Sequence, residues 1–148
     1  MDISQADDAR TVQRLADEPV VWFGSTRPDG RPHQVPVWFW CQDPDLVVFS
    51  ISGAQKLRNI DHEPSVALHL DSAQGGRDIV LAEGTAAAVD DRAIDHLVGG
   101  FVTKYASAFG PTGFSGWRAT FTQPILVLLT RVITWTRTDG ELAYRSVP

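Results

Sequence analysis

Cysteine is nearly absent from the sequence: Cys41 is the only one among 148 residues, so no disulfide can form within the chain. This composition agrees with a reducing compartment, and we expect a cytoplasmic protein. Long hydrophobic runs are absent as well, because the longest strongly apolar run, at 125–129, is far too short to cross a bilayer. The acidic start "MDISQADDAR" lacks the basic and apolar regions of a secretory signal. We therefore expect no membrane partner.

An excess of positive charge is also absent. The 13 Lys and Arg residues are outnumbered by 18 Asp and Glu residues, which gives a formal net charge of −5. Nucleic-acid-binding proteins usually carry a basic surface, so no DNA or RNA partner is expected. The length suits one domain with one hydrophobic core, which we place at residues 1–148.

The common catalytic motifs are missing too. The sequence contains no Gly-x-Ser-x-Gly turn, no phosphate-binding loop of the Walker type and no dinucleotide-binding glycine pattern. Its four histidines do not fall at metal-ligand spacing, so no metal is expected. Cys41 has no His or Lys beside it in the sequence, and we interpret it as a packed, unreactive thiol.

What the sequence does contain is a series of short segments rich in Val, Ile, Phe and Trp, separated by Pro, Gly and Asp, which is typical of a mostly β domain. Asp29-Gly30 predicts a hairpin between the first two segments, and Gly84 predicts a bulge in the fifth. Helices are expected at 5–16, between Gly53 and Pro64, and from Asp90 to Tyr105. The predicted strands are 20–26, 33–40, 46–51, 65–70, 78–89, 118–122, 126–136 and 142–145.

Several predicted strands are apolar on both faces, whereas a strand with one wet face alternates apolar and polar residues. In "HQVPVWFW", at 33–40, Trp38 and Trp40 share one face and Val35 and Val37 share the other. The outer faces need a cover, which the helices, a second subunit or a flat apolar ligand would supply. A homodimer is the most economical of these answers.

The segment "SGAQKLRNI", at 52–60, has an unusual charge pattern. Lys56 and Arg58 lie at a predicted helix start, where the helix dipole is already positive and acidic residues normally stand. A bound phosphate would satisfy both cations, the free N–H groups and nearby hydroxyls. Alternatively, both side chains point into solvent and pair with Asp61 or Glu63. The segment alone leaves both interpretations open.

Three segments in order resemble the flavin and deazaflavin split-barrel superfamily, which includes pyridoxamine 5'-phosphate oxidases: "GSTRPDGRPHQVPVWFW", "LVVFSISGAQKLRNIDHEPSVALHL" and "IVLAEGTAAAVDD". Within that superfamily the chain is most similar to small actinobacterial reductases that use coenzyme F420. The resemblance covers about residues 20–90. It implies a six-stranded antiparallel split β-barrel with flanking helices, the FMN-binding split-barrel fold. It also implies a homodimer with cofactors bound between the subunits.

The resemblance also implies roles for individual residues. The cofactor phosphate would be held by Lys56, Arg58 and Asn59. The edge of the ring system would be lined, largely through backbone groups, by Ser50, Ile51 and Ser52. The wall against which the ring packs would be formed by Val35, Pro36, Val37 and Trp38. Two residues would reach the groove from the other subunit, Trp117 and Arg118.

The activity that the resemblance implies is hydride transfer from reduced F420 to a conjugated small molecule, such as an enone, a quinone or a tetrapyrrole. Because the cofactor carries the chemistry, few titratable side chains are needed. The proton donor is not identified; solvent, Tyr105 and His33 are candidates. Two alternatives remain open: an FMN-binding oxidoreductase of the pyridoxamine phosphate oxidase type, and a non-catalytic cofactor-binding or carrier protein.

Overall fold

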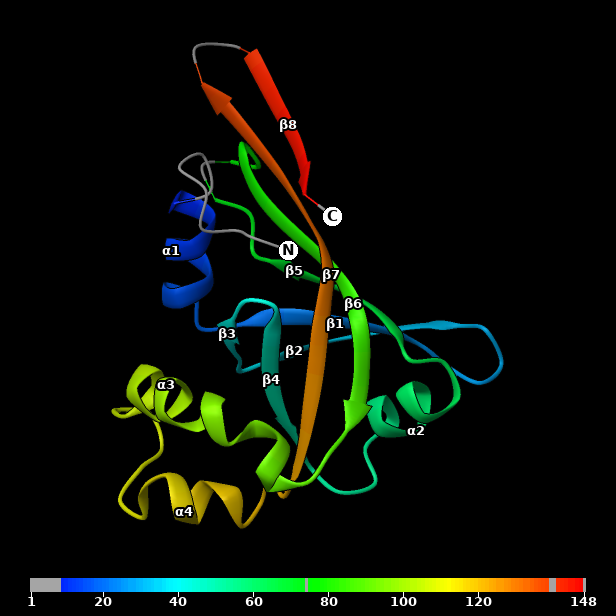
Figure 1. Cartoon of the computed structure of the whole chain (residues 1–148), viewed down its shortest axis with the longest axis vertical. Coiled ribbons are helices and arrows are strands. Elements are labelled where there is room, and N and C mark those ends of the chain that lie inside the picture. Colours follow the sequence, from blue (N-terminus) through cyan, green and yellow to red (C-terminus); the bar gives the residue numbers. More distant parts are fainter. Residues whose placement is uncertain (1–8, 74, 139–140, 148) are drawn as a thin grey trace.

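The computed structural model describes residues 9–73, 75–138 and 141–147. These residues form a curled antiparallel sheet of eight strands in the order β2-β1-β5-β6-β7-β4-β3, with β8 paired to β7 (Figure 1). The strands are β1 Val21–Thr26, β2 Pro32–Val37, β3 Trp40–Gln42, β4 Asp45–Ser50, β5 Ser65–Leu70, β6 Asp78–Ala88, β7 Gln123–Thr138 and β8 Glu141–Val147. The predicted mostly β fold is confirmed, but the sheet has eight strands rather than the six that the resemblance implies.

The helices lie in three places around the sheet. Figure 1 shows α3 and α4 together beside β3 and β4, while α2 lies on the opposite side, next to the β1–β2 hairpin. Their bounds are α1 Ala9–Asp17, α2 Gln55–His62, the 3₁₀ turn η2 Asp91–Ile94, α3 Asp95–Tyr105 and α4 Gly113–Arg118. All three predicted helices are present, although residues 5–8 of the first lie outside the described residues.

The two glycine-based predictions are confirmed. Antiparallel β1 and β2 are joined through the Asp29-Gly30 turn, in which Gly30 has a φ of 88°. In β6 the register with β7 shifts between Glu83 and Gly84. A Cβ at position 84 would collide with the Leu128 carbonyl oxygen, so this bulge needs a glycine.

Two of the strand predictions are wrong. Residues 118–122 are not a strand, because they form the end of α4 and the turn after it. The predicted strand 33–40 is split into β2 and β3, which are separated by Trp38 and Phe39. The Phe39 backbone N–H donates to the Tyr105 hydroxyl at 2.9 Å rather than to a neighbouring strand, so the ladder is interrupted there.

Two apolar clusters hold the fold together. The first fills the inside of the curled sheet and includes Phe23 and Phe39, both 0% exposed. The second joins the sheet to α3 and α4, and Trp38, Trp40 and Leu126 pack against it. The helices therefore cover part of the doubly apolar strands. They do not cover Leu128, which stays 48% exposed.

Candidate functional site

A pocket of about 440 Å³ lies where α2 and α4 approach the sheet. It brings together residues from β2, β4, α2 and α4, together with the segments that flank them. Of the twelve residues that the resemblance implicates, five line this pocket: Pro36, Val37, Trp38, Lys56 and Trp117. The remaining lining residues are Val20, Phe49 and Phe121.

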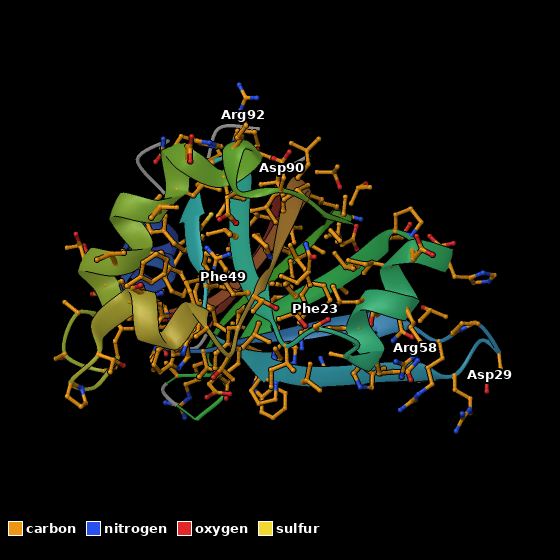
Figure 2. The ribbon with its side chains drawn as sticks, turned by 90° about the horizontal axis from the view of Figure 1, so that it is seen from below. Phe23, Asp29, Phe49, Arg58, Asp90 and Arg92 are labelled. Atoms are coloured by element: carbon orange, nitrogen blue, oxygen red, sulfur yellow. The ribbon has the colours of Figure 1, made fainter. Side chains whose placement is uncertain are left out.

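Stacked aromatic rings form one wall of the pocket. The Trp38 ring lies between Tyr105, with centroids 4.5 Å apart, and Trp117, with centroids 5.5 Å apart. Trp117 in turn stacks on Phe121 at 4.5 Å. Phe49, labelled in Figure 2, meets the Trp117 ring edge-on at 5.5 Å. Because Trp38 has neighbours on both faces, a planar ligand in this pocket would meet its edge.

Lys56 supplies the positive charge of the pocket wall. It is the second residue of α2, a helix with no acidic residue in its first turn and no side-chain cap at Ala54. The Lys56 side chain is half-buried, and this burial lowers its pKa. Within the described residues, no hydrogen bond or ion pair joins the Lys56 ammonium to another group.

The alternative in which the cations pair with Asp61 or Glu63 is not what the structure shows. Glu63 instead accepts a hydrogen bond from the Ser65 backbone N–H at 3.0 Å. Arg58 donates to the Gly53 carbonyl and to Gln55 Oε1, both at 2.6 Å, and so closes the loop before α2. The Arg58 side chain is exposed, and it lies on the same side of the molecule as Asp29 in the turn of the β1–β2 hairpin (Figure 2).

Asn59 lies inside the protein rather than in the pocket wall. Its side chain is 0% exposed, donates to Ser25 Oγ at 2.9 Å and accepts from Gln55 Nε2 at 2.7 Å. The bond to Ser25 fixes α2 to β1. In this structure Asn59 therefore positions the helix that carries Lys56, and its amide does not reach the pocket.

The segment 50–52 links β4 to α2 without lining the pocket. Ser50 is fully buried and its hydroxyl donates to the Ile51 carbonyl at 2.9 Å, whereas Ile51 is 50% exposed and Ser52 is exposed. Val35 packs against the first apolar cluster. The segment 50–52 thus precedes Lys56 in the chain without contacting the pocket. Val35 does not line the pocket either.

Trp117 and Arg118 both belong to α4, but only Trp117 reaches the pocket. Trp117 lines the pocket of its own chain, so no second subunit is needed to bring it there. Arg118 donates to the Phe121 carbonyl at 3.0 Å and to Asp91 Oδ1 at 2.8 Å, and its guanidinium lies 4.6 Å from the Phe49 ring centroid. These contacts hold α4 against the sheet.

Two other titratable groups, Tyr105 and Cys41, are poorly suited to chemistry. Burial raises the pKa of Tyr105 to about 12, and its hydroxyl is already bonded to the backbone of Pro19 and Phe39. Burial also raises the pKa of Cys41 to about 12, in agreement with an unreactive thiol. In the described ranges no three His, Cys, Asp or Glu side chains are grouped as a metal site.

None of the helices in the described part of the chain is long and apolar enough to cross a membrane.

Three lining residues were not predicted from the sequence: Val20, Phe49 and Phe121. A signal for one of them exists, because Phe114, Trp117 and Phe121 recur at helical spacing. Phe49 gives no such signal, since β4 is apolar on both faces and either face could have been the one turned to the pocket.

The comparisons with known proteins agree with this fold. Residues 8–123, more than half of the chain, match the family model described as pyridoxamine 5'-phosphate oxidase, so the chain belongs to that family. No curated protein sequence matches the chain.

Solved structures of the same fold cover most of the chain. The protein Rv2991 of Mycobacterium tuberculosis is 18% identical with a TM-score of 0.70, covering 87% of this chain and 84% of its own. A structure named F420 reductase is 22% identical with a TM-score of 0.61, and the match covers 81% of this chain and 94% of that one. A Listeria innocua protein, provisionally named pyridoxamine 5'-phosphate oxidase, is 16% identical with a TM-score of 0.63. The match covers 89% of this chain and 97% of that one. These similarities establish the split-barrel fold.

Proposed function

We propose that this protein is an oxidoreductase that binds coenzyme F420, a deazaflavin with a phosphate group, and transfers hydride to a flat conjugated small molecule such as an enone, a quinone or a tetrapyrrole. One observation carries the proposal: Lys56 is a half-buried cation without a described protein partner, and it stands in the wall of an aromatic pocket. A phosphate-bearing planar ligand satisfies both properties of this pocket.

The electrostatics favour an anion beside Lys56. Partial burial disfavours the charged ammonium, and no described carboxylate compensates it. The N-terminus of α2 adds its own partial positive charge and backbone N–H groups, without an acidic side chain to balance them. A phosphate bound here would neutralise Lys56 and accept from the free N–H groups.

The rest of the pocket favours a ring. Its volume of about 440 Å³ falls within the usual range for small-molecule sites. Pro36, Val37 and the edge of Trp38 offer an apolar surface that excludes water. Lys56 would thus fix the phosphate end of the ligand, while these residues would hold its planar end against β2.

The chain's own residues then have a positioning role. Reduced deazaflavin, when bound, supplies a hydride together with its two electrons. In a conjugated acceptor, the hydride adds to one carbon of the double bond and a proton from solvent adds to the other. The pocket would contribute by holding the acceptor at the ring and keeping bulk water away. Because Tyr105 is buried and bonded, it is not proposed as the proton donor.

FMN is the second candidate cofactor. The family to which the chain belongs favours it, and Lys56 would serve its phosphate equally well. F420 is preferred because of the sequence resemblance and the F420 reductase of similar fold. F420 also carries an acidic tail, and Arg27, Arg31 and Arg58 offer basic groups on the β1–β2 hairpin and α2.

We further propose that the protein is a homodimer. Leu128 on β7 is 48% exposed, and it lies opposite Thr85 of β6, whose side chain is also exposed. Neighbouring outward positions are small, such as Ala67 and Ala87, so another sheet surface could approach closely. A second copy of the chain would cover this apolar position.

The experiment is a titration of the wild-type protein with oxidised F420, reduced F420 and FMN in one buffer, followed by calorimetry and tryptophan fluorescence. We expect tight F420 binding and a changed emission from Trp38 and Trp117. Binding of FMN alone would replace F420 by FMN in the proposal. Binding without hydride transfer to any enone, quinone or tetrapyrrole acceptor would indicate a carrier.

Variants at position 56 test the anchor. Lys56→Ala should weaken cofactor binding at least tenfold, because one charge-assisted contact is worth about 1.5–3 kcal/mol. Lys56→Arg keeps the charge and should bind more tightly than Lys56→Ala. Arg92→Ala removes an exposed cation from η2, outside the pocket, and should leave binding unchanged. Equal affinities for wild type and Lys56→Ala would refute the anchor.

A further inference from the structure

The pocket that contains Lys56 has little charge to offer a second ligand. Among the described residues that line it, Lys56 alone is charged, and the others are Val, Pro, Phe and Trp side chains. The proposed function assigns Lys56 to the phosphate of the cofactor. A charge that is buried without a partner is costly, so the rest of the pocket discriminates between hydride acceptors by their charge.

Arg118 is a cation close to this pocket, but its hydrogen bonds are already made. Its guanidinium lies 4.6 Å from the centroid of the Phe49 ring, which lines the pocket. It donates to Asp91 Oδ1 at 2.8 Å and to the carbonyl oxygens of Phe121 at 3.0 Å and Thr122 at 3.3 Å. An acidic ligand would have to displace Asp91 to pair with this guanidinium. Arg118 therefore supports the aromatic wall without forming an anion site.

Lys56 and the aromatic residues of α4 reach the pocket from different sides. Figure 1 shows α2 and α4 on opposite sides of β4, and Figure 2 shows the same arrangement. Trp117 near the end of α4 and Phe121 in the following turn stack with their ring centroids 4.5 Å apart. The Phe121 backbone N–H also donates to the Trp117 carbonyl at 3.1 Å. A phosphate at Lys56 thus leaves the wall of Trp117 and Phe121 free for a second ligand.

The lining side chains in the described part of the chain offer hydrogen-bond donors and no hydrogen-bond acceptors. Besides the Lys56 ammonium, the donors are the indole N–H groups of Trp38 and Trp117. Neither indole N–H is engaged in a hydrogen bond with another described residue. A ligand with accepting oxygens and no acidic group matches this set of donors. The carbonyl oxygens of quinones and enones have this character.

We propose that the hydride acceptor is an uncharged carbonyl compound of the quinone or enone class, which binds against Trp117 and Phe121, and that the pocket rejects compounds with a free carboxylate. The inference rests on the proposed function for the phosphate that occupies Lys56. It narrows that function, because tetrapyrroles with free carboxylate side chains are excluded while their esters are not. Charge is then a property by which the pocket selects its substrate.

Reduction of such a compound needs no charged side chain at the ring. A quinone takes up one hydride and one proton, and its two carbonyl groups become the two hydroxyl groups of a hydroquinone. The two electrons of the hydride leave the reduced deazaflavin, which the proposed function supplies. Neither Tyr105 nor His33 lines this pocket, so the proton comes from solvent.

The direct test compares two probes that differ in charge, anthraquinone-2-carboxylate and its methyl ester, in the full-length protein with oxidised F420 bound. No hydride is available in this form, so quenching of tryptophan fluorescence measures binding alone. We expect the ester to bind about tenfold more tightly, because the carboxylate loses its hydration without gaining a partner. Equal affinities, tighter binding of the carboxylate, or no binding of the ester would each overturn the proposal.

A lysine in the aromatic wall should weaken this preference. Phe121→Lys places a cation beside the bound quinone and should raise the affinity for the carboxylate about threefold. Phe121→Gln removes the ring without adding charge and should keep the preference for the ester. Val12→Lys is the matched control, since it adds the same charge at a position that is 39% exposed on α1 and outside the pocket.

The result for Phe121→Lys is interpreted together with its circular dichroism spectrum. A native spectrum with an unchanged affinity for the carboxylate would show that Phe121 does not contact the hydride acceptor. If Phe121→Lys does not fold, the comparison of the two probes in the wild-type protein decides.

The two proposals fail in different ways. If neither F420 nor FMN binds, and the ester still binds more tightly than the carboxylate to the cofactor-free protein in phosphate buffer, the cofactor assignment is wrong and the selection by charge stands. If F420 binds and the two probes bind equally well, the cofactor assignment stands and the selection by charge is wrong.

Discussion

Tyr105 lies face to face with Trp38, with ring centroids 4.5 Å apart and ring planes 3° apart. The Tyr105 hydroxyl also accepts from the Phe39 backbone N–H at 2.9 Å and donates to the Pro19 carbonyl at 2.8 Å. One side chain of α3 therefore fixes the ring of Trp38 and the backbone that follows it. The pocket wall depends on a contact made outside the pocket.

Tyr105→Phe should lower the free energy of unfolding by about 1–3 kcal/mol, because it leaves the buried Phe39 N–H without an acceptor. Urea denaturation followed by far-UV circular dichroism measures the change. Thr103→Ala on the exposed side of α3 is the control and should shift stability by less than about 0.5 kcal/mol. An equal effect of the two substitutions would show that the hydroxyl contributes little.

Gly99 and Gly100 are neighbours in α3 with opposite expected responses to alanine. A Cβ at Gly99 meets no atom within 4 Å, so Gly99→Ala should stabilise the protein by up to about 1 kcal/mol through helix propensity. A Cβ at Gly100 would overlap the Trp40 indole. Gly100→Ala should therefore destabilise it by about 1–3 kcal/mol. Thermal unfolding of both variants tests the pair, and a stabilised Gly100→Ala would mean that Trp40 does not lie on this glycine.

Lys104 should make stability depend on pH. Its ammonium lies 3.6 Å from the Phe39 ring centroid, and burial lowers its pKa from 10.5 to about 8. Between these two values the unfolded chain binds more protons than the folded protein does, so this group adds stability as the pH rises from 8 to 10. The slope is at most about 1.4 kcal/mol per pH unit.

Lys104→Met lacks that titration, so the quantity to measure is the difference in unfolding free energy between wild type and Lys104→Met at pH 7, 8, 9 and 10. Above pH 8, the unfolding free energy of wild type should rise relative to that of Lys104→Met. The thiol of Cys41 has the opposite effect, because its raised pKa removes stability at high pH, but it is present in both proteins. A difference that stays constant with pH would contradict the lowered pKa of Lys104.

Leu128→Glu should convert the proposed homodimer into a monomer, because it places a charge at an exposed apolar position of β7. Light scattering coupled to size-exclusion chromatography gives the mass in solution. Leu128→Met keeps the position apolar and should remain dimeric. A monomeric wild-type protein would refute the dimer, and a dimeric Leu128→Glu protein would move the interface elsewhere.

The sequence predicts those features that obey local rules. The Asp29-Gly30 turn, the bulge at Gly84 and the helix of residues 90–105 depend on neighbouring residues, and all three are confirmed. The error at 118–122 has a physical origin: aromatic residues favour strands, but Trp117 and Arg118 end α4, and Phe121 in the following turn stacks on Trp117 in the aromatic cluster.

The residues of the candidate site likewise fall into those that a local rule predicts and those that only the tertiary fold reveals. Lys56 could be predicted, because a cation at a helix start departs from a local electrostatic preference. The role of Asn59 could not, since its partner Ser25 lies 34 residues away in the chain. The contact of Tyr105 with Phe39 spans 66 residues. Only the tertiary fold shows which polar side chains are already bonded within the protein and which remain free.

The stacking of Trp38 and Trp117 has an optical consequence. With their centroids 5.5 Å apart and their planes 11° apart, the two indoles are close enough for their electronic transitions to couple. Coupled indoles give a paired signal of opposite sign in circular dichroism, which vanishes when they separate. The circular dichroism signal of this indole pair therefore reports whether α4 is packed on the sheet, without any added dye.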